Sequence, residues 1–193
     1  MELEVPQVVA IPRGGVVVAA PVAKEVKSDI KLIIPRKVGA PQQPELAAGA
    51  VTPDGEVYYN KTVMQLLGLT PQLLEKNVER ELREMQSREK RYGKMLKEND
   101  VAGRSILLVD DGIATGFTVV ATVSYLKRML PKHLYLLIPV APQDTVEKMQ
   151  VEFDQVVCLE SPVGFTAVGA YYQIFEQVQD KEVQEILQKF GEA

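Results

Sequence analysis

The stretch that decides the fold reads Val109-Asp110-Asp111-Gly112-Ile113-Ala114-Thr115-Gly116-Phe117-Thr118. The residues that lead into it, Ser105–Val109, form a short, continuous and largely aliphatic run of the kind found in buried central strands. The residues that follow, Val119–Leu130, carry apolar side chains at helical spacing with no Gly or Pro between them. The sequence therefore predicts a loop between a strand and a helix, which we call the acidic loop (residues 110–118).

The acidic loop combines two carboxylates with small residues and hydroxyl groups. Gly112 and Gly116 permit close backbone approach, and Thr115 and Thr118 offer hydroxyl donors beside the unpaired amides of a helix start. This combination suits a phosphate monoester. Two carboxylates repel phosphate, but they accept hydrogen bonds from vicinal hydroxyls or hold a divalent ion. The loop therefore indicates a sugar phosphate ligand; the alternative is a plain turn in which an Asp caps the helix.

The string LLVDDGIATGFTVV resembles the phosphoribosyl-pyrophosphate motif of the type I phosphoribosyltransferases, in which four apolar residues precede two acidic residues and a Thr-Gly-x-Thr loop. The resemblance implies that Asp110 and Asp111 bind the ribose hydroxyls and that Ala114 through Thr118 wrap the 5′-phosphate. It also implies Mg²⁺ as the cofactor, held by the two Asp residues indirectly, through ribose hydroxyls or water. Donor contacts are expected from Gly112, Ile113, Ala114, Thr115, Gly116, Phe117 and Thr118.

Composition limits the functions open to the chain. Its 193 residues and 46% hydrophobic content suit a single domain over residues 1–193. A formal net charge of −4 disfavours nucleic acid as a partner. The lone cysteine, Cys158, and the lone histidine, His133, exclude an internal disulfide and disfavour a zinc site or a cysteine–histidine nucleophile pair. We expect Cys158 to be buried and His133 to lie on the surface.

Targeting signals are also missing from the sequence. No apolar run has the length needed to span a bilayer, and no signal peptide opens the chain. With the lone cysteine, these features predict a soluble cytoplasmic protein without a membrane partner.

Strand and helix patterns alternate along the chain, which predicts an α/β fold with a central, mostly parallel sheet flanked by helices. Strands are expected at Val8–Ile11, Lys31–Pro35, Ser105–Val109, Leu134–Val140 and Gln155–Leu159. Helices are expected at Val16–Val26, from Thr70 as N-cap to about Leu96, at Val119–Leu130 and Thr145–Phe153, and from a capping Asp180 to near Phe190. A short antiparallel excursion is expected from Gly49 to Tyr59, turning at Pro53-Asp54-Gly55.

Several candidate motifs follow strands of this parallel sheet, and ligands of such sheets bind at the carboxyl ends of the strands. The motifs are Arg13-Gly14-Gly15, a basic loop that starts at Arg36-Lys37, the acidic loop, and the segment after Leu159. Arg13 and the bare amides of Gly14 and Gly15 suit a pyrophosphate, and Arg36 or Lys37 could neutralise the same group. We therefore expect Arg13, Lys37, Asp110 and Asp111 to be the catalytic residues.

The family resemblance covers most of the chain. IPRGGVVVA is similar to the pyrophosphate loop after the first strand, and RKVGAPQQPELAAGAV resembles a basic loop in a subgroup of uncharacterised bacterial phosphoribosyltransferases. The resemblance implies a mobile flap within residues 42–69, with a fixed hairpin as the alternative. It also implies a small C-terminal hood, within a hood segment and helix over residues 161–193, and a homodimer.

The acceptor side has fewer signals in the sequence. Ala114 stands where members of the family that act on hypoxanthine or guanine usually have an aspartate, which moves any base-side proton transfer out of the acidic loop. Glu45 is a candidate proton carrier, with a plain loop carboxylate as the alternative. Because only Met1–Gln7 precede the first strand, we expect the hood to come mainly from Ser161 to Gln177, whose aromatic side chains either stack on an acceptor or pack on the core. Phe165 is the named acceptor candidate.

These features lead to one main functional expectation and two alternatives. The main one is a Mg²⁺-dependent phosphoribosyltransferase, a pentosyltransferase of nucleotide metabolism. It would move the 5-phosphoribosyl group from phosphoribosyl pyrophosphate to a small nitrogenous acceptor, with a purine-like base as one option, and release pyrophosphate. The first alternative is a non-enzymatic regulator that senses phosphoribosyl pyrophosphate with the same fold. The second is another phosphosugar reaction, because a fold does not dictate one chemistry.

Overall fold

The computed structural model describes residues 5–190, which divide into two compact units. The smaller unit comprises Ile34–Gly93 and Phe117–Tyr125, and the larger unit takes in the rest of the described chain. The expectations that concern residues 1–4 and 191–193, at the two ends of the chain, lie outside the described residues. The expectation of one domain over the whole chain stays a prediction.

The larger unit is built on a five-stranded parallel sheet with the strand order β2-β1-β6-β7-β8. The strands are β1 (Gln7–Ala10), β2 (Ile30–Leu32), β6 (Ser105–Val109), β7 (His133–Val140) and β8 (Gln155–Glu160). All five were expected from the sequence, and the parallel sheet confirms the predicted α/β class. In the interior strand β1, Val8, Val9 and Ala10 are fully buried, as expected for a strand covered on both faces.

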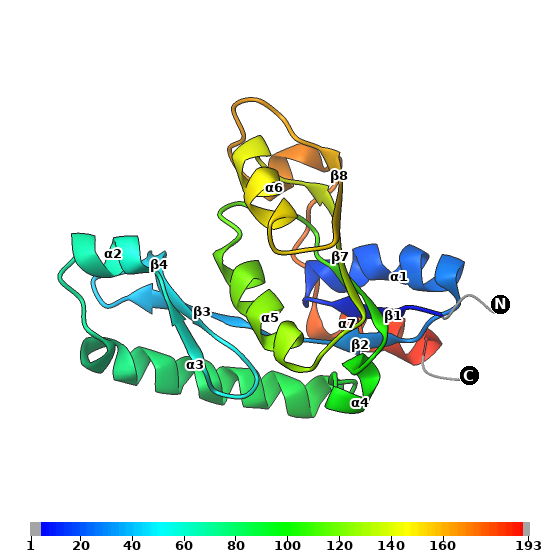
Figure 1. Ribbon diagram of the computed structural model, residues 1–193, viewed down its shortest axis with the longest axis horizontal. Helices are drawn as coiled ribbons and strands as arrows, with labels where there is room; N and C mark the ends of the chain where they lie inside the picture. The colour runs from blue at the N-terminus through cyan, green and yellow to red at the C-terminus, as the bar shows by residue number, and fades with distance from the viewer. Residues whose placement is uncertain (1–4, 191–193) are drawn as a thin grey trace. The chain divides into compact units, whose positions relative to one another are not determined.

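Helical segments connect these strands along the chain (Figure 1). They are α1 (Gly14–Val26), α4 (Glu98–Val101), α5 (Phe117–Arg128), α6 (Gln143–Gln150), a 3₁₀ turn η1 (Val168–Tyr171) and α7 (Asp180–Lys189). Helix α1 lies along β1, β2 and β6 and also packs on α7, whereas α6 packs on β8. Within the described residues, none of the helices is long and apolar enough to cross a membrane.

Two details of the helices and strands differ from expectation. Asp180 does not cap α7: Gln179 occupies the N-cap, where its amide N–H donates to Glu182 Oε2 at 2.7 Å. Cys158 is not fully buried, because β8 is the edge strand of the sheet and its residues alternate between half-exposed and exposed. His133 opens β7 and is half-exposed, close to the surface position expected.

The smaller unit contains a three-stranded antiparallel sheet, two complete helices and the first nine residues of α5. Its complete elements are β3 (Arg36–Ala40), β4 (Gln43–Val51), β5 (Val57–Tyr59), α2 (Lys61–Leu66) and α3 (Pro71–Tyr92). Its core is formed by Val38, Ala40, Ala48, Val51, Val63 and Leu74. The antiparallel excursion was therefore expected correctly, but it begins earlier than Gly49, with a strand that the sequence pattern did not reveal.

The predicted basic loop after Pro35 is in fact strand β3. Its sequence is interrupted by Gly39 and followed by Pro41, which favours a loop on local grounds. The strand forms because it pairs with β4 and because Val38 and Ala40 are buried in the core of the smaller unit. Gly39 is required by the pairing, since a Cβ at this position would overlap the carbonyl of Pro44.

Helix α3 also corrects an expectation. Pro71 occupies its first turn as predicted, but Thr70 makes no side-chain capping bond. The helix ends at Tyr92 rather than near Leu96, because Gly93 adopts the left-handed conformation with φ 69° and its N–H bonds to the Glu89 carbonyl. The chain then returns to the larger unit, where Leu96 N–H donates to the Leu32 carbonyl at 2.9 Å.

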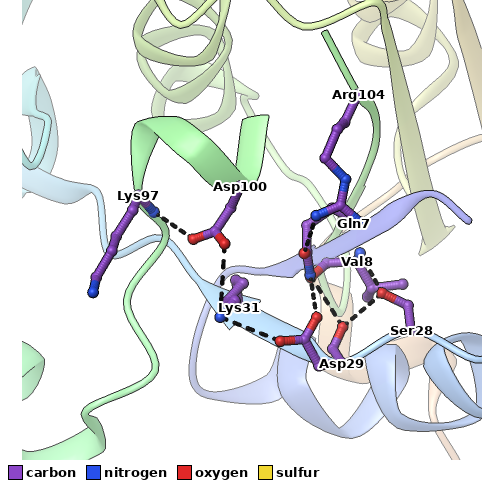
Figure 2. Close-up of polar contacts among 8 residues, drawn as sticks. All are labelled: Gln7, Val8, Ser28, Asp29, Lys31, Lys97, Asp100 and Arg104. Atoms are coloured by element: carbon purple, nitrogen blue, oxygen red, sulfur yellow. Dashed lines mark hydrogen bonds and ion pairs between the residues drawn. The ribbon is translucent and has the colours of Figure 1, made fainter. Parts of the chain in front are cut away.

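The amino ends of the parallel strands carry a polar network (Figure 2). Gln7 is buried, and its amide donates to the Asp29 carboxylate at 2.9 Å and accepts from Arg104 at 3.2 Å. Lys31 pairs with both Asp29 and Asp100, at 3.2 and 3.8 Å. Burial would raise the pKa of Asp29, but the hydrogen bonds from Gln7 and Lys31 and the positive charge of Lys31 outweigh it and lower that pKa. The side chains at this end satisfy one another.

Candidate functional site

The acidic pair lies at the carboxyl end of the parallel sheet. Strand β6 ends at Val109, so Asp110 and Asp111 are the next two residues, and the Asp111 amide donates to Asp110 Oδ1 at 2.9 Å. Burial, with the neighbouring charge of Asp111 as the second cause, raises the pKa of Asp110 well above its usual range. Burial also raises the pKa of Asp111. The site therefore favours ligands that stabilise negative carboxylates, namely hydroxyl donors or a cation.

A glycine pair brings a second loop directly against the acidic pair. Gly14 starts α1, and a Cβ at Gly14 would overlap the carboxylate of Asp111. A Cβ at Gly15 would lie 2.9 Å from the Val109 carbonyl oxygen and 3.0 Å from Asp110 Cα. Glycine is thus needed at both positions for the loop at residues 12–15 to approach the acidic residues, which lie far along the chain. The peptide bond before Arg13 in this loop is cis.

Arg13 lies at the start of the same helix and carries the positive charge of this region. Its guanidinium pairs with Asp180, the first residue of α7, with 3.8 Å between Nη1 and Oδ1. Both side chains are about one quarter exposed, so an anionic ligand can compete with Asp180 for the guanidinium. Together with the close approach of Gly14 to Asp111, this position makes the predicted pyrophosphate loop and the acidic loop neighbours in the folded chain.

The acidic loop is anchored at its middle and leaves a short exposed stretch. The Ile113 amide donates to the Val140 carbonyl at 3.1 Å, and the Thr145 hydroxyl donates to the Ala114 carbonyl at 2.8 Å. Gly116 has φ 73°, and a Cβ there would lie 2.9 Å from the Met149 methyl group. Ala114 and Thr115 are exposed between these anchors. Phe117 and Thr118 form the first turn of α5, whose first amides have no partner within the helix.

The segment after β8 closes over the acidic pair. Tyr172 donates from its hydroxyl to the backbone carbonyl of Asp111 at 2.6 Å. Val168 packs against Gly112, where a Cβ would lie 2.6 Å from a Val168 methyl carbon. Burial, followed by the charges of Asp111 and Asp110, raises the pKa of Tyr172 to about 12. The sequence marked Tyr172 only as one of several clustered aromatic residues, and nothing in the pattern indicated its bond to Asp111.

Two cavities border these loops. A cavity of about 570 Å³ is lined by Ala114, Thr115, Pro142, Gln143, Asp144, Thr145, Lys148 and Pro162 through Phe165. A cavity of about 490 Å³ is lined by Arg13, Gly14, Val17, Val18, Asp111, Tyr172 and Ile174 through Val178. Phe165 belongs to the first cavity, where its ring stacks on Tyr171 with 5.5 Å between centroids. Tyr172 and Phe175 belong to the second.

The predicted basic residues Arg36 and Lys37 lie on β3 in the smaller unit. Arg36 donates from Nε and Nη2 to the Glu81 carboxylate at 3.0 and 2.8 Å. Lys37 donates from Nζ to the backbone carbonyl of Glu45, and the Glu45 residue itself is exposed. Both cations therefore have partners within their own unit. Their expected contact with pyrophosphate, and the proton-carrier role of Glu45, stay predictions.

Comparison with known proteins adds independent information. A family model described as the phosphoribosyl transferase domain matches residues 2–173. Two Mycobacterium tuberculosis proteins, from strains CDC 1551 and H37Rv, bear the provisional name phosphoribosyl transferase; each is 37% identical over 176 residues, which is 91% of this chain. The chain spans 40% of the length of these relatives. A crystal structure of TT1426 from Thermus thermophilus superposes with a TM-score of 0.79 at 36% identity, covering 98% of this chain and 89% of that one.

Proposed function

The chain belongs to the phosphoribosyl transferase family, and from this premise we propose that it transfers the 5-phosphoribosyl group from phosphoribosyl pyrophosphate to a nitrogenous acceptor with release of pyrophosphate. The observation that carries the proposal is the contact of Gly14 with the Asp111 carboxylate. It brings a loop suited to pyrophosphate beside a carboxylate pair suited to a ribose diol, and phosphoribosyl pyrophosphate carries both groups on neighbouring carbons. We infer that the protein is cytoplasmic and forms a homodimer.

Each part of the donor has a candidate partner. Asp110 and Asp111 accept hydrogen bonds from the two ribose hydroxyls, which stabilises carboxylates that burial otherwise disfavours. Ala114 through Thr118 hold the 5′-phosphate with backbone amides and hydroxyls at the start of α5. Arg13 and the amides of Gly14 and Gly15 hold the pyrophosphate, with Arg36 and Lys37 as further candidate cations.

The residues of the larger unit suit a magnesium ion that arrives with the donor. The two carboxylates of the acidic pair lie side by side and have raised pKa values, so a nearby cation would relieve their repulsion. Among residues 5–190 no group of three or more His, Cys, Asp or Glu side chains could hold a metal by itself. We therefore propose Mg²⁺ held mainly by donor oxygens, with the acidic pair acting through hydroxyls or water; when bound, it neutralises leaving-group charge.

The proposed reaction is a displacement at C1 of the ribose. An unprotonated acceptor nitrogen supplies an electron pair for the new N–C1 bond as the C1–O bond breaks, and that bond's electrons leave with pyrophosphate. The proton displaced from the acceptor passes to water. Arg13 stabilises the negative charge that develops on the leaving oxygen, and the acidic pair fixes the ring that carries the developing oxocarbenium character. Orientation of the two reactants supplies much of the remaining rate enhancement.

Two further segments have proposed roles. Residues 42–69, which carry β4, β5 and α2, are the proposed flap that excludes water from the reacting sugar. The segment that starts at residue 161 is the proposed hood, and its described part ends at residue 190. Phe165, in the cavity beside Ala114 and Thr115, keeps its place as one acceptor candidate.

The proposal is tested by incubating the protein with phosphoribosyl pyrophosphate, Mg²⁺ and a panel of nitrogen heterocycles and measuring pyrophosphate release. We expect release with at least one acceptor, and near-complete loss in Gly14→Ala, because the added methyl group displaces the Asp111 carboxylate. Ser87→Ala is the control, since Ser87 is exposed on α3, outside the proposed donor site and the proposed flap. Calorimetric binding of the donor without any pyrophosphate release would favour the sensing regulator, and no binding at all would refute both.

A further inference from the structure

An apolar surface faces the second cavity from two distant parts of the chain. Val17 on α1 is 46% exposed, and Ile174 and Phe175 in the C-terminal segment are 78% and 51% exposed. All three line the cavity of about 490 Å³, together with Val18 of the same helix. Apolar side chains that gather in a concave place without covering one another are typical of a ligand site. We call this space the apolar cavity.

The apolar cavity borders the proposed reaction centre. Asp111, from the acidic pair, and Arg13 and Gly14, from the proposed pyrophosphate loop, all line it. The cavity that contains Phe165 instead borders Ala114 and Thr115, on the side proposed for the 5′-phosphate. A molecule in the apolar cavity is therefore next to Asp111, which would hold the ribose hydroxyls, and so close to the sugar that the acceptor must attack.

One aromatic ring in the apolar cavity is supported on one side. Phe175 packs against Gly169, where a Cβ would lie 2.5 Å from the ring, and against Tyr172 with 5.2 Å between ring centroids. About half of Phe175 is still exposed. A ring held in this way offers a fixed apolar surface to a flat aromatic ligand.

The polar groups of the apolar cavity are few and partly engaged. The Tyr172 hydroxyl already donates to the Asp111 carbonyl, and the Arg13 guanidinium pairs with Asp180. The other polar side chains in the lining are Asp111 itself, Glu176 and Gln177. If a ligand with several exocyclic oxygen or amino groups bound here, some of these ligand groups would be buried without hydrogen-bond partners, which lowers the affinity.

Resting on the proposed function, we propose that the apolar cavity binds the acceptor. We further propose that this acceptor is an uncharged aromatic nitrogen heterocycle with a largely apolar rim, of the benzimidazole type, rather than an oxygen-substituted purine such as hypoxanthine or guanine. The cavity has room for a fused two-ring heterocycle, whose flat face stacks on Phe175 and whose edge contacts Val17 and Ile174.

Acceptor specificity provides the first test. We expect kcat/KM for benzimidazole to exceed that for hypoxanthine and guanine by about tenfold or more, because only the polar bases leave unpaired groups in the cavity. Equal or higher kcat/KM for the polar bases would overturn the assignment of acceptor class.

A matched pair of aromatic variants tests the location. We expect Phe175→Ala to raise the KM for benzimidazole about tenfold and to leave the calorimetric affinity for phosphoribosyl pyrophosphate with Mg²⁺ unchanged. Phe165→Ala removes the ring that lines the other cavity, and the variant with the larger rise in acceptor KM identifies the cavity that binds the acceptor; we expect that variant to be Phe175→Ala. Val17→Gln is the second variant: it places a polar group in the apolar cavity from an exposed helical position and should also raise the acceptor KM.

Failure of this inference differs from failure of the proposed function. If pyrophosphate release occurs but only Phe165→Ala raises the acceptor KM, the acceptor binds in the other cavity and the transferase proposal stands. If phosphoribosyl pyrophosphate neither binds nor reacts, the transferase proposal fails. Saturation-transfer NMR with benzimidazole alone then tests whether the apolar cavity binds a heterocycle. A signal that is lost in Phe175→Ala and kept in Phe165→Ala supports binding there, and the absence of a signal in the unmodified protein refutes it.

Discussion

At the scale of single residues, the site depends on groups that are unfavourable for stability. Asp110 and Asp111 are two like charges with raised pKa values, held together by the hydrogen bond from the Asp111 amide to Asp110 Oδ1. Such an arrangement persists in a folded protein when a ligand uses it. Gly14 is a second residue on which the site depends, because only the absence of a side chain there allows the Asp111 carboxylate its position.

Replacing Asp110 should therefore raise stability and lower activity. A carboxyl group with a raised pKa binds its proton more tightly in the folded than in the unfolded state, so its ionised form destabilises the folded state above the folded-state pKa. This penalty fades as the pH falls through the folded-state pKa towards the unfolded value. Asp110→Asn keeps an oxygen for the Asp111 amide and loses the charge, so we expect it to be more stable than the unmodified protein near neutral pH, by about 1.4 kcal/mol for each unit of pKa elevation.

Urea unfolding as a function of pH measures this effect. The stability difference between Asp110→Asn and the unmodified protein should shrink as the pH is lowered from neutral towards the unfolded-state pKa. We expect kcat/KM for phosphoribosyl pyrophosphate to fall about ten- to a hundredfold, because a charge-assisted hydrogen bond to the ribose is weakened. A variant that is less stable than the unmodified protein near neutral pH would contradict the argument.

Tyr172 should hold the acidic pair through its hydroxyl alone. Tyr172→Phe keeps the ring and leaves the Asp111 carbonyl without its donor, so we expect a loss of about 1 kcal/mol in unfolding free energy and a severalfold weaker affinity for phosphoribosyl pyrophosphate. Because the pKa of Tyr172 is raised to about 12, the hydroxyl stays protonated and the effect of the substitution should not change between mildly acid and mildly alkaline pH. Calorimetric titration measures it, with Tyr171→Phe as the control; equal affinities in the two variants would refute the role.

At the scale of the elements, local pattern and tertiary pairing disagree most at β3. Arg36–Ala40 reads as a loop along the sequence, yet it forms a strand that β4 and the buried faces of Val38 and Ala40 stabilise. Helix α3 contributes Glu81, which is 8% exposed and accepts two hydrogen bonds from Arg36. This ion pair joins the strand to the helix and explains how a basic residue is accommodated at the start of β3.

Removing Glu81 should therefore destabilise the smaller unit. Glu81→Ala leaves the Arg36 guanidinium, whose side chain is only 24% exposed, without its carboxylate, and we expect a loss of about 2–3 kcal/mol. Glu79→Ala is the control on the same helix: Glu79 pairs with Arg83 at 3.7 Å, but both side chains are more than half exposed, so its loss should cost less than about 0.5 kcal/mol. Thermal unfolding of the two variants measures the difference, and equal losses would contradict a structural role for the Arg36–Glu81 pair.

At the scale of the whole molecule, the chain runs repeatedly between two compact units. The smaller unit is Ile34–Gly93 plus Phe117–Tyr125, so the chain leaves the larger unit and returns to it twice. Helix α5, Phe117–Arg128, is shared, because its first nine residues belong to the smaller unit and its last three to the larger. Because the hydrogen bonds of one helix form and break cooperatively, unfolding of the α5 residues in one unit destabilises the α5 residues in the other, which favours joint unfolding.

Joint unfolding is what a single domain over residues 1–193 requires. We expect one transition in differential scanning calorimetry, with a calorimetric enthalpy equal to the van't Hoff enthalpy. Gly93→Ala, which destabilises the end of α3 in the smaller unit, should lower the temperature of the whole transition. Two separate transitions, of which only one moves in this variant, would show that the units unfold independently.

The sequence by itself determined the elements whose burial follows a local period. The five parallel strands, the helices α1, α3, α5 and α6 and the acidic loop at the end of β6 were predicted, because periodicity and turn residues report on each segment separately, whereas the short helices α2 and α4 were not. The positions of Arg13, Gly14 and Gly15 at the start of α1 followed from the same reasoning. The family resemblance came from the acidic loop, from the stretch around Arg13 and from residues 36–51.

Only the tertiary structure decided the contacts that make a site out of these segments. The packing of Gly14 on Asp111, the bond from Tyr172 to the Asp111 carbonyl and the separation of Phe165 from Phe175 into two cavities join residues that are distant in the chain. Strand β3 belongs to the same class, since its pairing with β4 outweighs its loop-like composition. The physical reason is that such contacts depend on which surfaces meet after folding, and no local pattern encodes the partner.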